Sequence, residues 1–95
     1  MKLFEQVEQR LVDAGLAQRR PKFGGGTYLA RCDLMVIDGD SEVILIPMLY
    51  PEPNRPRHTD GQIRKTLEMT RAAMAGLSGV RIQSEPMGRV VALAA

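Results

Sequence analysis

The chain has 95 residues, 44% of them hydrophobic, and 13 basic residues against 11 acidic ones give a formal net charge of +2. This length is enough for one compact domain, residues 1–95, and too short for two separate cores. The near balance of charge does not demand a polyanionic partner. Cys32 is the only cysteine, which excludes an internal disulfide and a zinc site built from several thiolates.

The pattern of apolar residues also bears on location. Charged residues interrupt the apolar ones throughout residues 1–10, so this segment lacks the apolar core of a signal peptide. No run approaches the roughly 20 apolar residues of a membrane-spanning helix. We therefore expect a soluble, cytoplasmic protein with no membrane partner.

The first predicted element is an amphipathic helix from Lys2 to Ala14. Its apolar residues recur at helical spacing: Leu3, Phe4, Val7, Leu11 and Val12. Gly15 follows the last turn and can adopt a left-handed cap, which Leu16 would close with an apolar contact.

A basic segment ending in three glycines comes next, residues 18–26. We expect an irregular, flexible connector, because three consecutive glycines lack the spacing of a phosphate-binding loop. The alternative is that the glycine backbone and the neighbouring cations form an anion-binding concavity.

The strongest pairing signal in the chain is a β-hairpin around Asp38-Gly39-Asp40-Ser41. Its first strand is predicted to run without interruption from about Thr27 to Ile37, and its second to about Tyr50. A turn centred on Gly39-Asp40 would place three pairs opposite each other on the inner face: Val36 with Val43, Leu34 with Leu45, and Ala30 with Leu49. Pro47 cannot donate a ladder hydrogen bond, so we expect an edge or a bulge there.

The outer face of this hairpin is also apolar, although an antiparallel hairpin with one wet face should alternate apolar and polar residues. A soluble monomer rarely exposes such a patch, so we interpret it as a protein interface, most simply of a homodimer. The candidate interface residues are Leu29, Met35, Ile44, Ile46, Met48 and Tyr50.

After the hairpin, the proline-rich residues 50–58 predict an extended loop. Arg55, Arg57 and His58 are candidates for an anion contact, and the alternative is a solvated loop. A lone loop histidine is weak evidence of catalysis, because spacing places no nucleophile or carboxylate beside it.

Thr59 and Gln62 have the spacing of a capping box and open the second predicted helix. An apolar stripe at helical spacing predicts packing against a sheet: Ile63, Leu67, Thr70, Met74 and Leu77. The last segment, from Val80 to Leu93, is interpreted as a second hairpin turning at Pro86 and Gly88.

These elements predict an α+β fold of order αββαββ, in which two amphipathic helices pack on one face of an antiparallel sheet of about four strands. Two helices cannot cover both faces, so the outer face of the first hairpin would stay open. The alternative places one helix on each side of the sheet and leaves no interface.

We rank a small, non-enzymatic protein-binding module, adaptor-like or inhibitor-like and self-associating, first among the functions. The alternative is a nucleic-acid-binding domain that uses local clusters of basic residues. Its candidate contacts are Arg19, Arg20, Lys22, Arg55, Arg57, His58, Arg64, Lys65 and Arg71.

An enzyme ranks last, because no catalytic constellation is recognisable. Asp38, Asp40 and Glu42 lack the loop pattern of an EF-hand, and Cys32 is expected on the inner strand face as a buried thiol. No metal, cofactor or small-molecule ligand is predicted.

Overall fold

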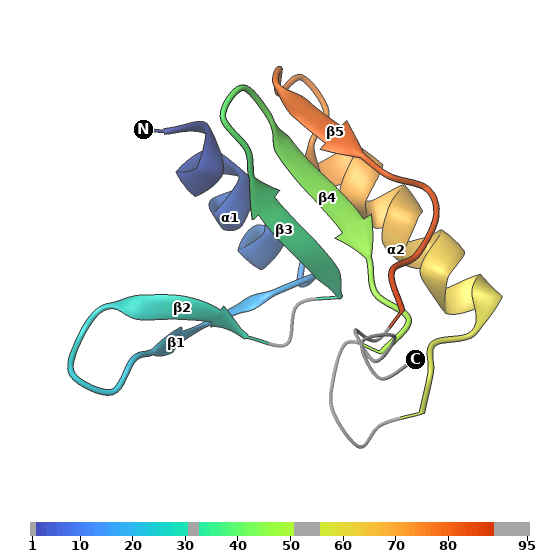
Figure 1. The fold of residues 1–95 in the computed structure, drawn as a ribbon, viewed down its shortest axis with the longest axis horizontal. Coiled ribbons are helices and arrows are strands. Elements are labelled where there is room, and N and C mark those ends of the chain that lie inside the picture. Colours follow the sequence, from blue (N-terminus) through green and yellow to red (C-terminus); the bar gives the residue numbers. More distant parts are fainter. Residues whose placement is uncertain (1, 31–32, 51–55, 89–95) are drawn as a thin grey trace, which may run out of the picture.

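The computed structural model describes residues 2–30, 33–50 and 56–88 and is an α+β fold with two helices and two small sheets (Figure 1). The element order is α1 (Leu3–Asp13), β1 (Gln18–Pro21), β2 (Thr27–Ala30), β3 (Leu34–Asp38), β4 (Val43–Pro47), α2 (Asp60–Ala73) and β5 (Val80–Ile82). Strands β1 and β2 form one sheet, and β3, β4 and β5 form the other in that order. The α+β class is as predicted, whereas the single four-stranded sheet and the order αββαββ are not.

Helix α1 ends as the sequence predicts. Gly15 has a φ of 77°, the left-handed conformation that glycine adopts without steric cost. The amide of Leu16 donates to the Leu11 carbonyl at 2.9 Å and that of Gly15 to the Val12 carbonyl at 3.1 Å, the two bonds of a Schellman motif. Leu16 is buried in the core beside Leu11, so the cap also fixes where the chain leaves the helix.

The predicted connector at residues 18–26 is instead a hairpin, and that prediction is wrong. Strand β1 pairs antiparallel with β2, with Arg20 opposite Tyr28 and Pro21 opposite Thr27. The loop between them closes through the amide of Lys22, which donates to the Gly26 carbonyl at 3.0 Å. Gly24, Gly25 and Gly26 all have positive φ angles, so the three glycines make a tight reversal rather than a flexible link.

The long first strand predicted for residues 27–37 is divided between the two sheets. Ala30 in β2 pairs with Gln18 and not with Leu49, while Leu34 begins β3 and pairs with Pro47. Cys32, expected on the inner strand face, lies outside the described residues. The alternation of apolar residues continues across the break between the two strands, so this pattern does not reveal where the first strand ends.

Strands β3 and β4 form the predicted antiparallel hairpin with a register shifted by two residues. Val36 lies opposite Leu45 and Asp38 opposite Val43, because the loop has four residues and its Gly39 amide donates to the Glu42 carbonyl at 2.9 Å. A shift of two preserves the side-chain faces. The inner-face prediction is therefore confirmed: Leu34, Val43 and Leu45 are buried in the core, and Val36 packs against it.

The prediction of an entirely antiparallel sheet is wrong at β5. Strand β5 runs parallel to β4, with Val43 opposite Val80 and Leu45 opposite Ile82. The chain still runs parallel to β4 at Met87, which bridges to Met48, so it does not reverse at Pro86. The proposed return strand, from residue 89 onward, lies outside the described residues. A 14-residue α2 between β4 and β5 supplies the crossover that a parallel pair requires.

Pro47 is neither at an edge strand nor in a bulge of its own strand. It is buried at the end of the central strand β4. The segment that follows β5 is bonded to β4 on either side of this point. The Gln83 amide donates to the Leu45 carbonyl and the Met87 amide to the Pro47 carbonyl, and between these two bonds the segment leaves the β4 ladder. The missing N–H of the proline thus falls where no ladder bond is required.

Helix α2 begins at the predicted capping box. The Thr59 hydroxyl accepts from the Gln62 amide at 3.2 Å, and the Gln62 side chain accepts from the Thr59 amide at 2.8 Å. Its buried side is the predicted stripe, including Ile63, Leu67 and Thr70.

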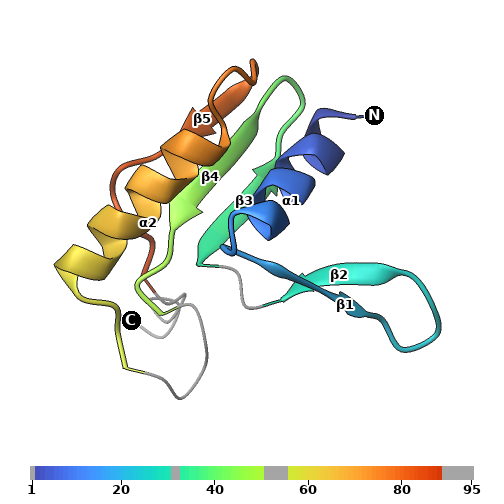
Figure 2. The same cartoon turned by 180° about the vertical axis from the view of Figure 1, so that it is seen from behind.

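Both helices cover the same face of the three-stranded sheet, and β1–β2 projects from the body as an arm (Figures 1 and 2). The core between helices and sheet includes Val7 and Leu11 of α1, Leu45 of β4, and Met74 after α2. Within the described residues, the other face of the sheet therefore has no helical layer.

Candidate interaction sites

The first candidate site is the free edge of β3. In the part of the chain that the structure describes, β3 has a hydrogen-bonded neighbour only on its β4 side. The strand sequence is Leu-Met-Val-Ile-Asp, which contains neither a proline nor a lysine, the residues that commonly block an edge strand from pairing with another chain.

The hydrogen-bond pattern shows which backbone groups of β3 face this edge. The Gly39 amide bonds to Glu42 and the Met48 amide to the Asp33 carbonyl. In an antiparallel pair, bonded and non-bonded residue pairs alternate, so Met35 and Ile37 bond to β4. The amides and carbonyls of Leu34, Val36 and Asp38 therefore point away from β4, toward the open side.

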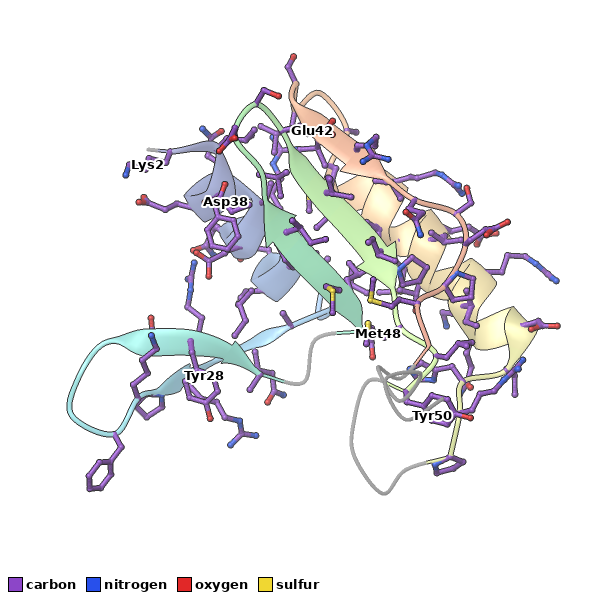
Figure 3. The ribbon with its side chains drawn as sticks, viewed as in Figure 1. Lys2, Tyr28, Asp38, Glu42, Met48 and Tyr50 are labelled. Atoms are coloured by element: carbon purple, nitrogen blue, oxygen red, sulfur yellow. The ribbon has the colours of Figure 1, made fainter. Side chains whose placement is uncertain are left out.

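The outer sheet face brings together part of the predicted interface. Met35 and Ile44 are half-buried and lie on this face, and Ile37, opposite Ile44, is 37% exposed. Ile46 is on the same face but only 4% exposed. Met48 and Tyr50 follow the end of β4 and are half-buried (Figure 3).

Leu29 does not join this patch. It lies in β2, on the other sheet, and packs against the buried core cluster. The contiguous open part of the outer face is therefore smaller than the sequence suggests and centres on Met35, Ile37 and Ile44.

An open groove of about 510 Å³ borders β3 on the side of the arm. It lies between α1, β2 and β3, and its lining includes Phe4, Glu8, Lys22, Tyr28, Leu29 and Val36. Its lining mixes apolar side chains with one acidic and one basic side chain, Glu8 and Lys22.

The predicted basic residues fall into three separate groups. Arg19, Arg20 and Lys22 lie on the arm, where the Arg19 guanidinium donates to the Gln9 side chain at 2.7 Å. Arg64, Lys65 and Arg71 lie on the exposed side of α2. Arg57 precedes α2 and pairs with Asp60 at 3.1 Å, and Arg55 lies outside the described residues.

His58 has a carboxylate neighbour that spacing did not reveal. Its Nε2 lies 3.5 Å from Oδ1 of Asp33, and its Nδ1 lies 3.3 Å from Oε1 of Gln62. The His58 amide donates to the Leu49 carbonyl at 2.8 Å. The imidazole thus lies between the loop before α2 and Asp33, its Nε2 is buried without a hydrogen-bond partner among the described residues, and no described serine or cysteine adjoins it in a hydrogen bond.

The acidic turn does not form a metal site. Among the described residues, no group of three or more histidine, cysteine or acidic side chains converges. Glu42 instead accepts from the Arg81 guanidinium at 3.1 Å, and Asp38 and Glu42 lie at the end of the hairpin near Lys2 (Figure 3).

Two exposed apolar residues escaped the sequence reasoning. Phe23 at the tip of the arm is fully exposed, and Ile37 lies at the free edge. Phe23 was not singled out because its segment was interpreted as a connector. The predicted register placed Ile37 opposite Glu42, whereas in the structure it lies opposite Ile44. A search for aromatic residues close to basic residues within residues 18–28 would have identified Phe23.

No protein-family model, curated protein or solved structure matches this chain. Neither described helix has the length and apolar character needed to cross a membrane.

Proposed function

We propose that this chain is a protein-binding module that self-associates by pairing the free edge of β3 with β3 of a second copy. The observation that carries this proposal is an unprotected edge strand whose backbone groups point outward beside an exposed isoleucine. Strand addition supplies main-chain hydrogen bonds, and side chains on alternate positions supply specificity.

The pairing would be antiparallel and centred on Val36. In a twofold-symmetric contact the same patch meets itself, so Val36 would lie opposite its own copy and Met35 opposite Ile37 of the second chain. Two three-stranded sheets would join into one sheet of six strands. The exposed apolar row of Met35 and Ile37 would then continue across the contact, and the groove beside β3 would receive the added strand.

A proline at position 36 tests this geometry. Val36→Pro removes the amide that points to the open edge and leaves the β3–β4 hydrogen bonds in place, because proline is tolerated where the N–H faces outward. We expect the wild-type chain to run as a dimer in size-exclusion chromatography with light scattering, and Val36→Pro as a folded monomer.

Met35→Pro is the matched control. Its amide bonds to β4, so this variant should lose much of its thermal stability, whereas Val36→Pro should keep most of it. A wild-type chain that stays monomeric at high micromolar concentration would rule out the self-association. A Val36→Pro variant that remains dimeric would place the contact elsewhere than at the β3 edge.

A further inference from the structure

We infer that the β1–β2 arm is a binding site for single-stranded nucleic acid, separate from the β3 edge. Arg20 and Lys22 would contact phosphates, and Tyr28 and Phe23 would stack on unpaired bases. Proteins that bind single strands combine cations that follow the backbone with aromatic side chains that stack on the bases. The arm brings both kinds of group together on one exposed ribbon.

The charge of the arm is the first observation. Residues 18–30 contain three cations, Arg19, Arg20 and Lys22, and no acidic residue, although the whole chain is nearly neutral. All four residues of β1 are exposed, so these charges lie in water. A local potential of this kind attracts phosphates even when the net charge is small.

The pairing register separates the two faces of the arm. Arg19 lies opposite Leu29, and both are turned toward the body, since Arg19 bonds to Gln9 of α1 and Leu29 packs against the core. Arg20 lies opposite Tyr28 on the other face. The side chain of Tyr28 extends on the side of the arm away from α1 (Figure 3).

The face of the arm that carries Arg20, turned away from the body, is also the face that favours an anion. Glu8 of α1 lines the groove beside the arm together with Lys22 and Tyr28, and a polyanion lying in that groove would meet this carboxylate. A strand lying over Arg20, which is not among the residues lining the groove, avoids it. We therefore assign the main contact to Arg20 rather than Arg19.

The aromatic residues are the second observation. The chain has two tyrosines and two phenylalanines, and the arm holds Tyr28, 45% exposed, and Phe23, fully exposed at the tip. An exposed phenylalanine gains nothing for folding, and the positive φ angles of Gly24, Gly25 and Gly26 hold the loop that presents it. Stacking requires unpaired bases, which favours a single strand over a duplex.

The test measures binding of fluorescently labelled oligothymidylate and oligoadenylate by anisotropy, between ~50 and ~200 mM salt. Removing two phosphate contacts should reduce the salt slope by about 1.4. We expect Arg20→Ala with Lys22→Ala to weaken binding at low salt at least about tenfold and to reduce the slope by that amount. Arg19→Ala should weaken binding less than Arg20→Ala.

The matched control is Arg64→Ala with Lys65→Ala on α2, which removes the same number of positive charges. This variant should bind within about twofold of wild type, since screening limits the effect of charges remote from the ligand. An equal loss in both double variants would show that overall charge, not the arm, is responsible and would overturn the inference.

Phe23→Ala with Tyr28→Ala tests the stacking without changing charge, and we expect a loss of about tenfold with an unchanged salt slope. Tighter binding to the duplex of the same sequence, or no effect of the aromatic variant, would refute stacking on single strands. Polyglutamate that competes as well as the oligonucleotide would indicate an acidic protein partner instead. Absence of binding to every probe at ~50 mM salt would also overturn the inference.

Discussion

At the scale of single residues, Arg10 joins the two helices. Its guanidinium Nη1 donates to the carbonyls of Ala73 at 3.0 Å and Ala75 at 2.8 Å, at the end of α2. Those carbonyls lack helical partners and lie at the negative end of the helix dipole. One side chain from α1 thus satisfies the last turn of α2 and fixes the spacing of the helices over the sheet.

Arg10→Met keeps the aliphatic stem of this side chain but removes both bonds. We expect a loss of about 1–2 kcal/mol in the free energy of unfolding, measured by urea denaturation. Arg71→Met, on the exposed side of α2, is the control and should change stability by less than about 0.5 kcal/mol. Equal effects of the two substitutions would mean that the bonds of Arg10 add nothing beyond a surface charge.

At the scale of elements, the arm depends on backbone conformation rather than on burial. Gly24 and Gly25 have φ angles of 92° and 108°, and a Cβ on either would meet no atom within 4 Å. A side chain there has room, so the cost of substitution is conformational strain, on the order of 1–2 kcal/mol. Because the arm is exposed, that strain should open it without unfolding the body.

Gly25→Ala therefore should raise the hydrogen-exchange rate of the Lys22 amide, which closes the loop, about tenfold. The Gln83 amide, bonded to Leu45 in the main sheet, should keep its protection. Gly61→Ala is the contrasting substitution, because this glycine lies in the first turn of α2, where alanine is favoured. Faster exchange at both amides in Gly25→Ala would show that the arm and the body unfold together.

The sequence predicted the elements whose stability comes from burial. Both helices, their caps at Gly15 and Thr59, and the inner face of β3–β4 follow from apolar periodicity and local side-chain chemistry. Strand β1 could not be found this way, because its four residues are all exposed and leave no alternation of apolar and polar residues.

The direction in which β5 pairs with β4 could not be predicted from the local pattern of apolar and polar residues either. A three-residue strand such as β5 looks the same whether it pairs parallel or antiparallel, and only the position of α2 between β4 and β5 decides it. The same limit applies to the sites. The outer face was predicted because apolar residues occur on both faces of the hairpin, where an alternation with polar residues was expected. The free edge of β3 instead depends on which strands pair, and the arm depends on a turn that periodicity does not describe.

At the scale of the whole molecule, the one-sided layering sets what the outer sheet face does. Both helices pack on the inner face (Figure 2), so Ile44, in the middle of the central strand, lies half-buried between Ile37 of β3 and Arg81 of β5. In the proposed pairing the contact runs along β3, one strand away from Ile44, so a charge on this face should leave both the fold and the pairing in place. If the face belongs to the core, the same charge should unfold the chain.

Ile44→Lys distinguishes these cases. We expect a folded chain that is still a dimer by light scattering, with a loss of stability near 1 kcal/mol, since the ammonium group can reach water from a half-buried site. Ile44→Glu should behave alike even though it faces Arg81 with the opposite charge. Val43→Lys, on the buried inner face, should unfold the chain. Dissociation of both Ile44 variants into folded monomers would contradict the edge pairing and place the contact on the outer face, whereas unfolding by Ile44→Lys as complete as by Val43→Lys would make the outer face part of the core.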